Sequence, residues 1–299
     1  MSKEIIREFT LLQSVINAIP APIFFKDSAG VYLGCNHAFE KFVGKTRDQL
    51  IGKGVFELWE SSLAQRYFDA DDSLIRSGGS QIYEAQVEYA DGTLHDVVFH
   101  KSVFFAESEA ISGLVGVILD ITERKCAEKE LQKLATTDAL TQLSNRHYLY
   151  QALDTACARA KRQDSGLAVL FLDLDGFKAV NDGYGHALGD QLLAAAAATL
   201  RASVREADLI ARFGGDEFVV VVENPGTMAQ VEVIANKLID SLSQPFQIQD
   251  ATLQIGASIG IARYPDNGID SEQLLRLADV ALYEAKARGK GRCFFSMEG

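Results

Sequence analysis

The sequence predicts an α+β protein of two domains that a helix connects. The length of 299 residues suits two domains of ordinary size. Residues 23–121 hold short apolar runs separated by turn residues, which predict a small antiparallel sheet domain. Residues 122–137 lack glycine and proline and predict a helix, and residues 138–299 alternate strand and helix patterns around an acidic hairpin. We therefore expect boundaries at residues 1–121, 122–137 and 138–299.

Composition and charge exclude several classes of protein. Hydrophobic residues make up 47% of the chain, enough for two cores, and the net charge of −12 argues against a protein that coats nucleic acid or anionic membranes. The longest nearly apolar run, Ala110 to Leu119, is too short to span a bilayer. The cysteines are scattered without metal-binding spacing, and the charged N-terminus is unlike a signal peptide. We expect a cytoplasmic location with reduced thiols.

The first domain begins with an amphipathic helix over residues 1–20, which Pro20 and Pro22 end. Short strands are predicted at 23–25 and 31–33, and a helix at 36–43. Longer strands are predicted at 82–89, 95–104 and 114–121, with Asp91-Gly92 as the hairpin turn between the first two. The sum is a small antiparallel sheet with helices on one face.

This part resembles a PAS sensor domain over roughly residues 10–122. The resemblance is carried by four short motifs: Asn36-His37-Ala38-Phe39, Gly44, Asp91-Gly92 and Asp120-Ile121-Thr122. It is specific for the fold and leaves the PAS ligand unknown, because such domains hold haem, flavin, small acids or nothing. Candidate haem ligands are His37, His95 and His100, although each is more simply a surface or strand histidine. Trp59 is most simply a packing residue.

The connecting helix carries a narrow apolar stripe. Ala127, Leu131 and Leu134 recur at spacings of four and three, which is the pattern of a short coiled coil. The alternative is a monomeric linker helix lying on one domain. We favour the coiled coil, because the remaining residues are polar and leave nothing else to bury. This helix and the PAS domain together are expected to form a homodimer.

The second domain alternates strands and helices. A buried strand is predicted at 167–172, a long helix at 191–204, a hairpin of strands 208–213 and 219–222 with Gly214-Gly215 at its tip, and a helix at 228–242. A strand at 253–264 and a helix at 271–288 complete the pattern. The order β-α-α-β-β-α-β is that of a ferredoxin-like split sheet.

Three carboxylates are expected to meet at one edge of this sheet. Asp173 ends one strand, and Asp216 and Glu217 lie on the hairpin whose strand should neighbour it. Such a density of oxygen ligands is typical of Mg²⁺ or Mn²⁺, with substrate phosphates as further ligands. The lysines available for phosphate are Lys178, Lys286 and Lys290. The simpler alternatives are a solvated acidic turn and ordinary surface lysines, but the combination favours a nucleotidyl-transfer site.

Over about residues 136–297 the second domain resembles GGDEF domains, the diguanylate cyclase family with a nucleotidyl-cyclase palm. The matching segments are Asp138–Thr141, Asn145-Arg146, Asp173–Asp182, Gly185-His186, Gly189-Asp190, Arg212–Phe218, Ser258–Gly260 and Ala278–Lys286. The resemblance implies condensation of two GTP into cyclic di-GMP and two pyrophosphates. It implies metal ligation by Asp173, the Leu174 carbonyl, Asp216 and Glu217, and base recognition by Asn181 and Asp190.

The same resemblance implies further roles. Substrate contacts are expected from Phe177, Lys178, Gly214, Gly215, Lys286 and Lys290, and the general base is either Asp216 or Glu217. Arg205-Glu206-Ala207-Asp208 fits the family's Arg-x-x-Asp product-inhibition site, with Arg205 and Asp208 binding guanine. The simpler alternative is an exposed pair three residues apart. Gln142 stands where the family usually has glycine, away from the acids, and Lys290 where many members have arginine.

Three functions remain open at this point. The first is a sensor-controlled diguanylate cyclase, and the second is an inactive module that binds cyclic di-GMP or GTP as an effector. In the third, the PAS region is only a dimerisation scaffold. The chain keeps all the acids and glycines that degenerate members usually lose, which favours the enzyme.

Overall fold

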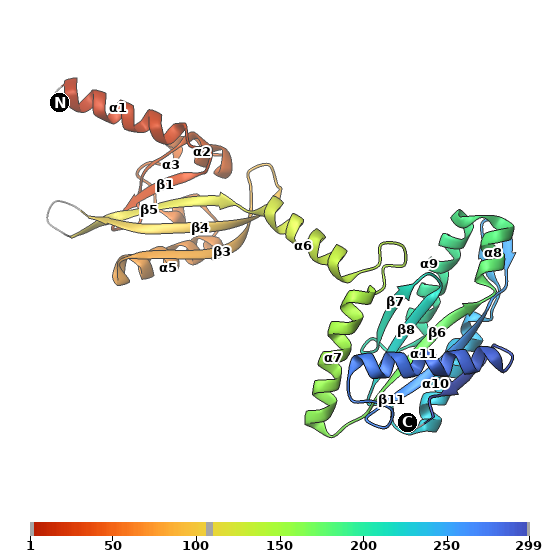
Figure 1. Cartoon of the computed structure of the whole chain (residues 1–299). Helices are drawn as coiled ribbons and strands as arrows, with labels where there is room; N and C mark the ends of the chain where they lie inside the picture. The colour runs from red at the N-terminus through yellow and green to blue at the C-terminus, as the bar shows by residue number, and fades with distance from the viewer. Residues whose placement is uncertain (1–2, 106–109, 298–299) are drawn as a thin grey trace. The chain divides into compact units, whose positions relative to one another are not determined.

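The computed structural model describes residues 3–105 and 110–297, which form two compact units, residues 1–129 and 130–299 (Figure 1). The division falls within the predicted connecting helix. The first unit contains a five-stranded antiparallel sheet in the order β2-β1-β5-β4-β3. Its strands are β1 (Ile23–Asp27), β2 (Tyr32–Cys35), β3 (Ser80–Glu88), β4 (Leu94–Phe105) and β5 (Ile111–Asp120).

Helices cover one face of this sheet and enclose an aromatic core. They are α2 (His37–Val43), α3 (Arg47–Leu50), α4 (Val55–Leu58) and α5 (Ser61–Ser77), whereas α1 (Lys3–Asn17) lies on the opposite face, beside Phe25, Phe104 and Val115. Phe24, Tyr32 and Phe39 meet in the core with ring centroids 5.1–5.9 Å apart. The predicted antiparallel sheet is therefore confirmed, with strand ends shifted by one to three residues.

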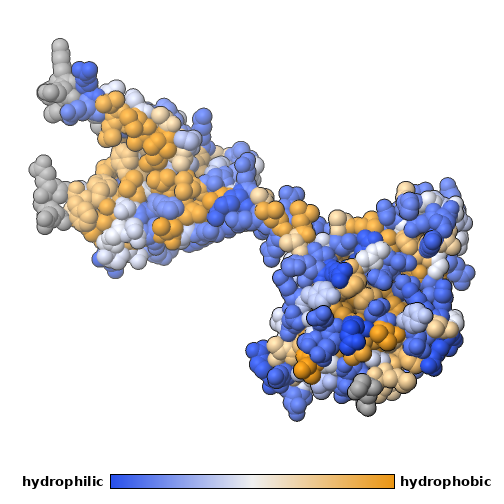
Figure 2. Space-filling model, in the orientation of Figure 1, coloured by the Kyte–Doolittle hydropathy of each residue, from blue (hydrophilic) through white to orange (hydrophobic). Residues whose placement is uncertain are grey.

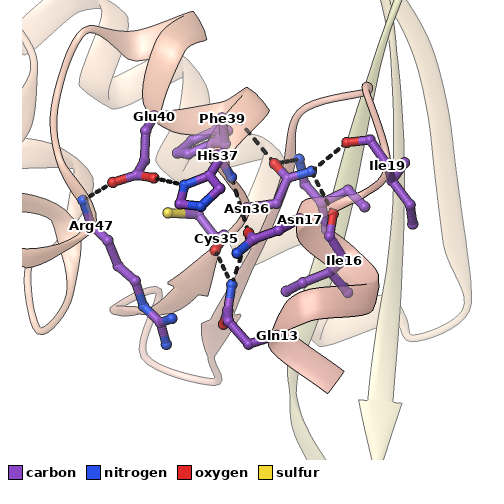
Figure 3. Close-up of polar contacts among 11 residues, drawn as sticks. Gln13, Ile16, Asn17, Ile19, Cys35, Asn36, His37, Phe39, Glu40 and Arg47 are labelled. Atoms are coloured by element: carbon purple, nitrogen blue, oxygen red, sulfur yellow. Dashed lines mark hydrogen bonds and ion pairs between the residues drawn. The ribbon is translucent and has the colours of Figure 1, made fainter. Parts of the chain in front are cut away.

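Asn36 joins the start of the sheet to the end of α1 (Figure 3). Its Oδ1 accepts hydrogen bonds from the amides of Ile23 at 2.9 Å and Phe39 at 3.0 Å, the second of which caps α2. Its Nδ2 donates to the carbonyls of Ile16, Ile19 and Ala21 at 2.8–3.1 Å. Because Asn36 is fully buried and its hydrogen bonds are satisfied, it fixes the entry of α1 into the fold.

One side of helix α1 is apolar and exposed to solvent. Leu11, Leu12 and Val15 are each more than half exposed, and Figure 2 shows hydrophobic side chains gathered over α1 and the adjoining sheet. The helix α6 (Thr122–Thr136) likewise buries none of its described side chains. On α6, Leu131 and Leu134 of the predicted stripe are 66% and 68% exposed. Both helices thus present apolar surface that their own unit leaves uncovered.

The second unit contains a five-stranded sheet in the order β12-β11-β6-β8-β7. Its strands are β6 (Leu167–Asp175), β7 (Leu209–Gly214), β8 (Glu217–Glu223), β11 (Gly256–Tyr264) and β12 (Cys293–Phe295). Only β12 pairs in parallel; the other pairs are antiparallel. The central strand β6 is an almost continuous apolar run, because helices cover both of its faces.

The helices form two layers around this sheet. One core cluster packs α8 (Phe177–Tyr184), α9 (His186–Ser203) and α10 (Met228–Leu242) on one face. The other packs α7 (Arg146–Gln163) and α11 (Ser271–Ala287) on the opposite face. No helix in the described part of the chain is long and apolar enough to cross a membrane. All four cysteines are free thiols, as expected.

Three local expectations were wrong. The predicted strand 253–264 is interrupted: β9 (Phe246–Ile248) and β10 (Ala251–Leu253) form a separate small hairpin, and β11 begins at Gly256. The helix expected from residue 191 begins at His186, because Gly185 with φ 85° separates it from α8. The acidic hairpin has Gly215 and Asp216 at its tip rather than two glycines, since a bulge near Phe213 extends β7 to Gly214.

Candidate active site

The acidic edge of the second sheet is built from the end of β6 and the β7–β8 hairpin. Asp173 and Glu217 are paired residues of neighbouring antiparallel strands. The Leu174 amide donates to the Asp216 carbonyl at 3.3 Å, so the hairpin tip is joined to the end of β6. The sequence prediction that Asp173, Asp216 and Glu217 share one edge is confirmed by this register.

Arg212 holds the hairpin tip in place. Its guanidinium donates to the Gly215 carbonyl at 2.8 Å from one nitrogen and at 3.0 Å from Nε. A third nitrogen lies 3.3 Å from both Asp138 carboxylate oxygens. Asp138 in turn accepts from the Thr141 amide and hydroxyl at 2.8 and 2.7 Å. The sequence analysis matched Arg212 and Asp138 to the family pattern. It missed that they form one hydrogen-bonded network, which holds the hairpin tip in position.

The carboxylates of the edge repel one another. Burial, and then the negative charge of Asp173, raise the pKa values of both Asp216 and Glu217. The exposed carboxylate of Asp279 on α11 raises the pKa of Glu217 further. Lys286, also on α11, forms an ion pair with Asp173 at 2.6 Å and acts in the opposite direction on both groups. One ammonium thus faces several acids, and the edge has an excess of negative charge.

The donor set suits a hard divalent cation, although it is not assembled around one. Within the described ranges, no three His, Cys, Asp or Glu side chains are grouped closely enough to hold a metal ion. The carboxylate of Asp173 instead forms an ion pair with Lys286. Carboxylate and carbonyl oxygens are nevertheless the ligands that Mg²⁺ prefers, and the mutual repulsion of these acids would be relieved by a cation.

A second group of predicted residues lies on α8 and α9. Asn181 is half-buried, and its Oδ1 has no hydrogen-bond partner in the part of the chain that the structure describes. Gly189 leaves room for it, because a Cβ there would collide with Asn181 Oδ1. Asp190 is exposed beside Gly189, whereas Phe177 is 7% exposed within the core. Phe177 therefore supports α8 through packing, and Asn181 Oδ1 is a buried acceptor packed against Gly189, with no partner among the described residues.

The comparisons with known proteins fit this geometry. Residues 135–292 match the family described as "Diguanylate cyclase, GGDEF domain". The chain belongs to the GGDEF family. Residues 16–125 match the PAS fold, so a PAS domain precedes the GGDEF domain. A curated relative is the "Bifunctional diguanylate cyclase/cyclic di-GMP phosphodiesterase MucR" of Pseudomonas aeruginosa, which is 51% identical over 170 residues, 56% of this chain. The chain spans about a quarter (25%) of that relative's length.

Solved structures resemble the GGDEF domain. The GGDEF domain of TpbB, also called YfiN, from Pseudomonas aeruginosa is 39% identical, with a TM-score of 0.53 over 54% of this chain and 94% of that one. The coiled coil and GGDEF domain of DgcB from Caulobacter crescentus, solved in complex with c-di-GMP, is 27% identical. Its TM-score is 0.54 over 58% of this chain and 93% of that one.

The remaining predicted phosphate ligands of the GGDEF domain lie on exposed turns. Lys178 is exposed on the first turn of α8. Lys290 is exposed after α11 and adopts a left-handed backbone with φ 62°, between Gly289 and Gly291, which also have positive φ. Gly214 and Gly215 are exposed, and a Cβ on either would meet no atom within 4 Å. The open glycine backbone leaves the hairpin tip accessible to a ligand.

Asp175 is a residue of this edge whose role the sequence did not reveal. Its Oδ2 accepts from the Ser258 hydroxyl at 2.7 Å and the Gly291 amide at 3.2 Å. It thereby joins β6, β11 and the turn that carries Lys290. The Asp-x-Asp spacing after a buried strand was a signal for it, since residues 173 and 175 face the same side of β6.

The predicted inhibitory motif forms a tight turn. Asp208 is 6% exposed, and its Oδ2 accepts from the Arg205 amide at 3.0 Å. The Arg205 side chain is exposed, and the Arg201 guanidinium donates to the carbonyls of Glu206 and Asp208 at 3.0 and 3.1 Å. The simpler alternative of an exposed pair does not hold for Asp208, whose buried carboxylate shapes the turn, and guanine binding by Arg205 and Asp208 stays a prediction.

Gln142 has a backbone conformation that explains the glycine usual at this position in the family. Its φ is 58°, in the left-handed region that a side chain disfavours. Its Nε2 donates to the Ala139 carbonyl at 2.6 Å, which offsets part of that cost. Glutamine in place of the family's usual glycine therefore strains the backbone locally at residue 142, near the start of the domain.

Proposed function

We propose that the chain is a PAS-regulated diguanylate cyclase that condenses two GTP into cyclic di-GMP and two pyrophosphates. The observation that carries this proposal is the register of β6 with β8, which brings Asp173 beside Glu217 at the edge that Lys286 also reaches. Nucleotidyl transfer requires anionic groups for a cation and cationic groups for phosphates in one place. Residues 135–292 match the family described by that activity.

Mg²⁺ or Mn²⁺ would be held by Asp173, the Leu174 carbonyl, Asp216 and Glu217. When bound, the metal neutralises phosphate charge and polarises the α-phosphorus toward attack. Lys286, which pairs with Asp173 at 2.6 Å, is the nearest cation for the triphosphate. Lys178 and Lys290 are exposed and long enough to add further phosphate contacts, and Gly214 and Gly215 let phosphate approach the backbone.

The reaction forms one bond and breaks one bond at each α-phosphorus. The 3′-oxygen of one GTP attacks the α-phosphorus of the other, pyrophosphate leaves, and the hydroxyl proton passes to a base. The raised pKa values of Asp216 and Glu217 make both better proton acceptors than an ordinary exposed carboxylate. Asn181, with its unpartnered Oδ1, and Asp190 on the adjacent helix would read the donor groups of guanine.

Cyclic di-GMP is two-fold symmetric, so two GGDEF domains must face each other, each with one GTP. A homodimer supplies that symmetry. The apolar stripe of α6 supports dimerisation, because Leu131 and Leu134 are 66% and 68% exposed in the part of the chain that the structure describes. Joining the two domains through this helix raises the effective concentration of the second active site.

Product inhibition would act through Arg205. Its side chain is exposed on a turn that Asp208 and Arg201 hold rigid, and a guanidinium can donate two hydrogen bonds to guanine O6 and N7. Asp208 would then act by positioning the turn. The alternative function, an inactive module that binds cyclic di-GMP or GTP as an effector, shares this feature but gives no reason for the acidic edge.

The direct test is product analysis. The full chain is incubated with GTP and Mg²⁺, and nucleotides are separated and identified by mass spectrometry. We expect cyclic di-GMP from the wild type and a loss of at least about a hundredfold for Asp216→Asn. The exposed carboxylate variant Asp240→Asn, on α10, serves as the matched control. Binding of GTP without any turnover in the wild type would favour the effector instead.

The dimer is tested separately by light scattering. Leu131→Lys combined with Leu134→Lys should give a monomer with a small fraction of wild-type activity at the same protein concentration. Activity should recover as concentration rises, because encounter then replaces tethering. An active wild-type monomer, or full activity of the double variant at low concentration, would contradict the role of α6.

A further inference from the structure

The PAS domain encloses a cavity of about 650 Å³ between its sheet and its helices. Its walls are rich in aromatic side chains, among them Tyr32, Phe39, Trp59, Tyr67 and Phe99. Ligand pockets in proteins commonly have about 300–1,000 Å³ and similar walls with a few polar groups. None of the candidate haem ligands His37, His95 and His100 is among the described side chains that line it. His95 instead pairs with Asp120 at 2.7 Å.

Three charged side chains lie buried together in the wall of this cavity. Lys26 on β1 and Lys101 on β4 each donate to a different oxygen of Asp71 on α5, both at 2.6 Å. The three residues are 1%, 3% and 3% exposed. Burying a charge is expensive unless it is paired, so one carboxylate between two ammonium groups requires a specific explanation.

Two ammonium groups against one carboxylate leave one positive charge uncompensated. The other charged groups lining the cavity, Lys45, Glu60, Arg66 and Glu88, are two cations and two anions and cancel. Burial is the main cause that lowers the pKa of Lys26, and the charge of Lys101 adds to it, whereas Asp71 opposes them. An additional anion at this place would favour the charged form of both lysines.

The two ammonium groups also have donors to spare. Each Nζ carries three N–H groups, and within residues 3–105 and 110–297 each has one hydrogen bond, to Asp71. Aromatic faces also lie near them: the Tyr32 ring is 4.3 Å from Lys26 Nζ, and the Tyr83 ring 5.4 Å from Lys101 Nζ. These rings stabilise the cations in part, but they accept no conventional hydrogen bond.

We propose that this cavity binds an aromatic monocarboxylate, whose carboxylate accepts hydrogen bonds from Lys26 and Lys101 while its ring packs among the aromatic walls. One negative charge neutralises the cluster. A phosphate dianion would leave a net negative charge in the same buried place, and a neutral ligand would leave the positive one. The ring follows from the walls, because flat aromatic surfaces pack and stack well together.

The test uses phenylacetate, 3-phenylpropanoate and 4-phenylbutanoate, each compared with its neutral primary amide. Affinity for the full chain is measured by calorimetry, and location by fluorescence of Trp59, the one tryptophan of the chain, which lines the cavity. We expect at least one acid to bind about tenfold or more tightly than its amide, since charge-assisted hydrogen bonds are about twice as strong as neutral ones. Its binding should change the Trp59 emission.

Lys101→Met should reduce the acid-to-amide ratio to near one while the fold persists, because Lys26 and Asp71 remain as a neutral pair. Lys26→Met should do the same and serves if Lys101→Met fails to fold. Lys41→Met, at an exposed lysine of α2, is the matched control and should keep the ratio. Equal affinity for acids and amides, survival of the preference in both cavity variants, or no acid binding at millimolar concentration would each overturn the proposal.

Discussion

The two domains each bring charged side chains together, but with opposite sign and in different surroundings. In the PAS domain, Lys26 and Lys101 share Asp71, all three are buried, and the excess charge is positive. In the GGDEF domain, the acids of the sheet edge meet Lys286, all of them partly exposed, and the excess is negative. Neither cluster is neutral by itself.

This difference indicates what each place is built to receive. A buried positive excess favours one complementary anion and excludes water, which suits a ligand that is held for long times. A half-exposed negative excess can be tolerated in water and relieved by a cation that arrives with its substrate. The same reasoning about uncompensated charge therefore supports both proposals, a sensor ligand in the PAS domain and metal-dependent chemistry in the GGDEF domain.

Removing Lys286, the cation that pairs with Asp173, should have the largest effect on catalysis. Lys286→Met takes away the ion pair with Asp173 and a phosphate contact, so we expect turnover to fall about tenfold to a hundredfold. The pKa values of Asp216 and Glu217 should rise further, since Lys286 lowers both. Steady-state kinetics with GTP measures the effect. The control is Lys161→Met, at an exposed position of α7. Near-normal turnover would contradict the role of Lys286.

Asn181 extends the comparison to an uncharged group. Its Oδ1 lacks a hydrogen-bond partner among the described residues, just as each charged cluster lacks a compensating charge. Gly189→Ala should push the Asn181 side chain aside and raise KM for GTP about tenfold, the cost of one lost hydrogen bond to a ligand. Gly183→Ala, on the same helix as Asn181 and with open space around the new Cβ, should leave KM unchanged. An equal KM in the two variants would remove Asn181 from the site.

The sequence predicted the acidic edge better than the buried cluster, for a physical reason. Asp173 and Glu217 follow from topology, because antiparallel strands in this order must be neighbours. Asp71 is 45 residues from Lys26 and 30 from Lys101, and the three come from three elements, so no local motif joins them. A weak signal existed: Lys26 alternates in phase with buried Phe24, and Lys101 with buried Phe99. The bulge that moved the hairpin tip to Asp216 had no comparable signal.

Lowering the pH should erase the repulsion at the acidic edge. Because burial and Asp173 raise the pKa values of Asp216 and Glu217 above those of the unfolded chain, the folded protein binds these protons more tightly. Their ionisation therefore costs stability above the folded pKa values, and the cost disappears as pH falls through the unfolded ones. Asp216→Asn should melt about 2 °C above wild type at pH 7 and equal it near pH 4. If the difference in melting temperature between Asp216→Asn and wild type grew toward low pH, the repulsion at the acidic edge would be contradicted.

A strained position outside both clusters provides an uncharged reference. Gln142→Gly should stabilise the GGDEF domain by about 0.5 kcal/mol, because glycine adopts φ 58° without steric cost, less the entropy it adds to the unfolded chain. Gln142→Ala, which keeps the strain and loses the hydrogen bond to Ala139, should destabilise it. Urea unfolding measures both, and turnover should stay at the wild-type level. A destabilising Gln142→Gly would mean that the side-chain hydrogen bond outweighs the strain.

The most direct measurement makes the same substitution in both clusters. Asp71→Asn leaves two buried ammonium groups unpaired and should cost about 3–5 kcal/mol, whereas Asp216→Asn removes repulsion and keeps the Asp173–Lys286 pair. Calorimetry of the full chain at pH 7 measures the unfolding transitions of the two domains. Trp59 fluorescence identifies which of them belongs to the PAS domain. We predict that Asp71→Asn lowers the PAS melting temperature by about 10 °C or more, while Asp216→Asn leaves the GGDEF transition unchanged or raises it. Equal destabilisation by both variants would contradict the opposite excess charges.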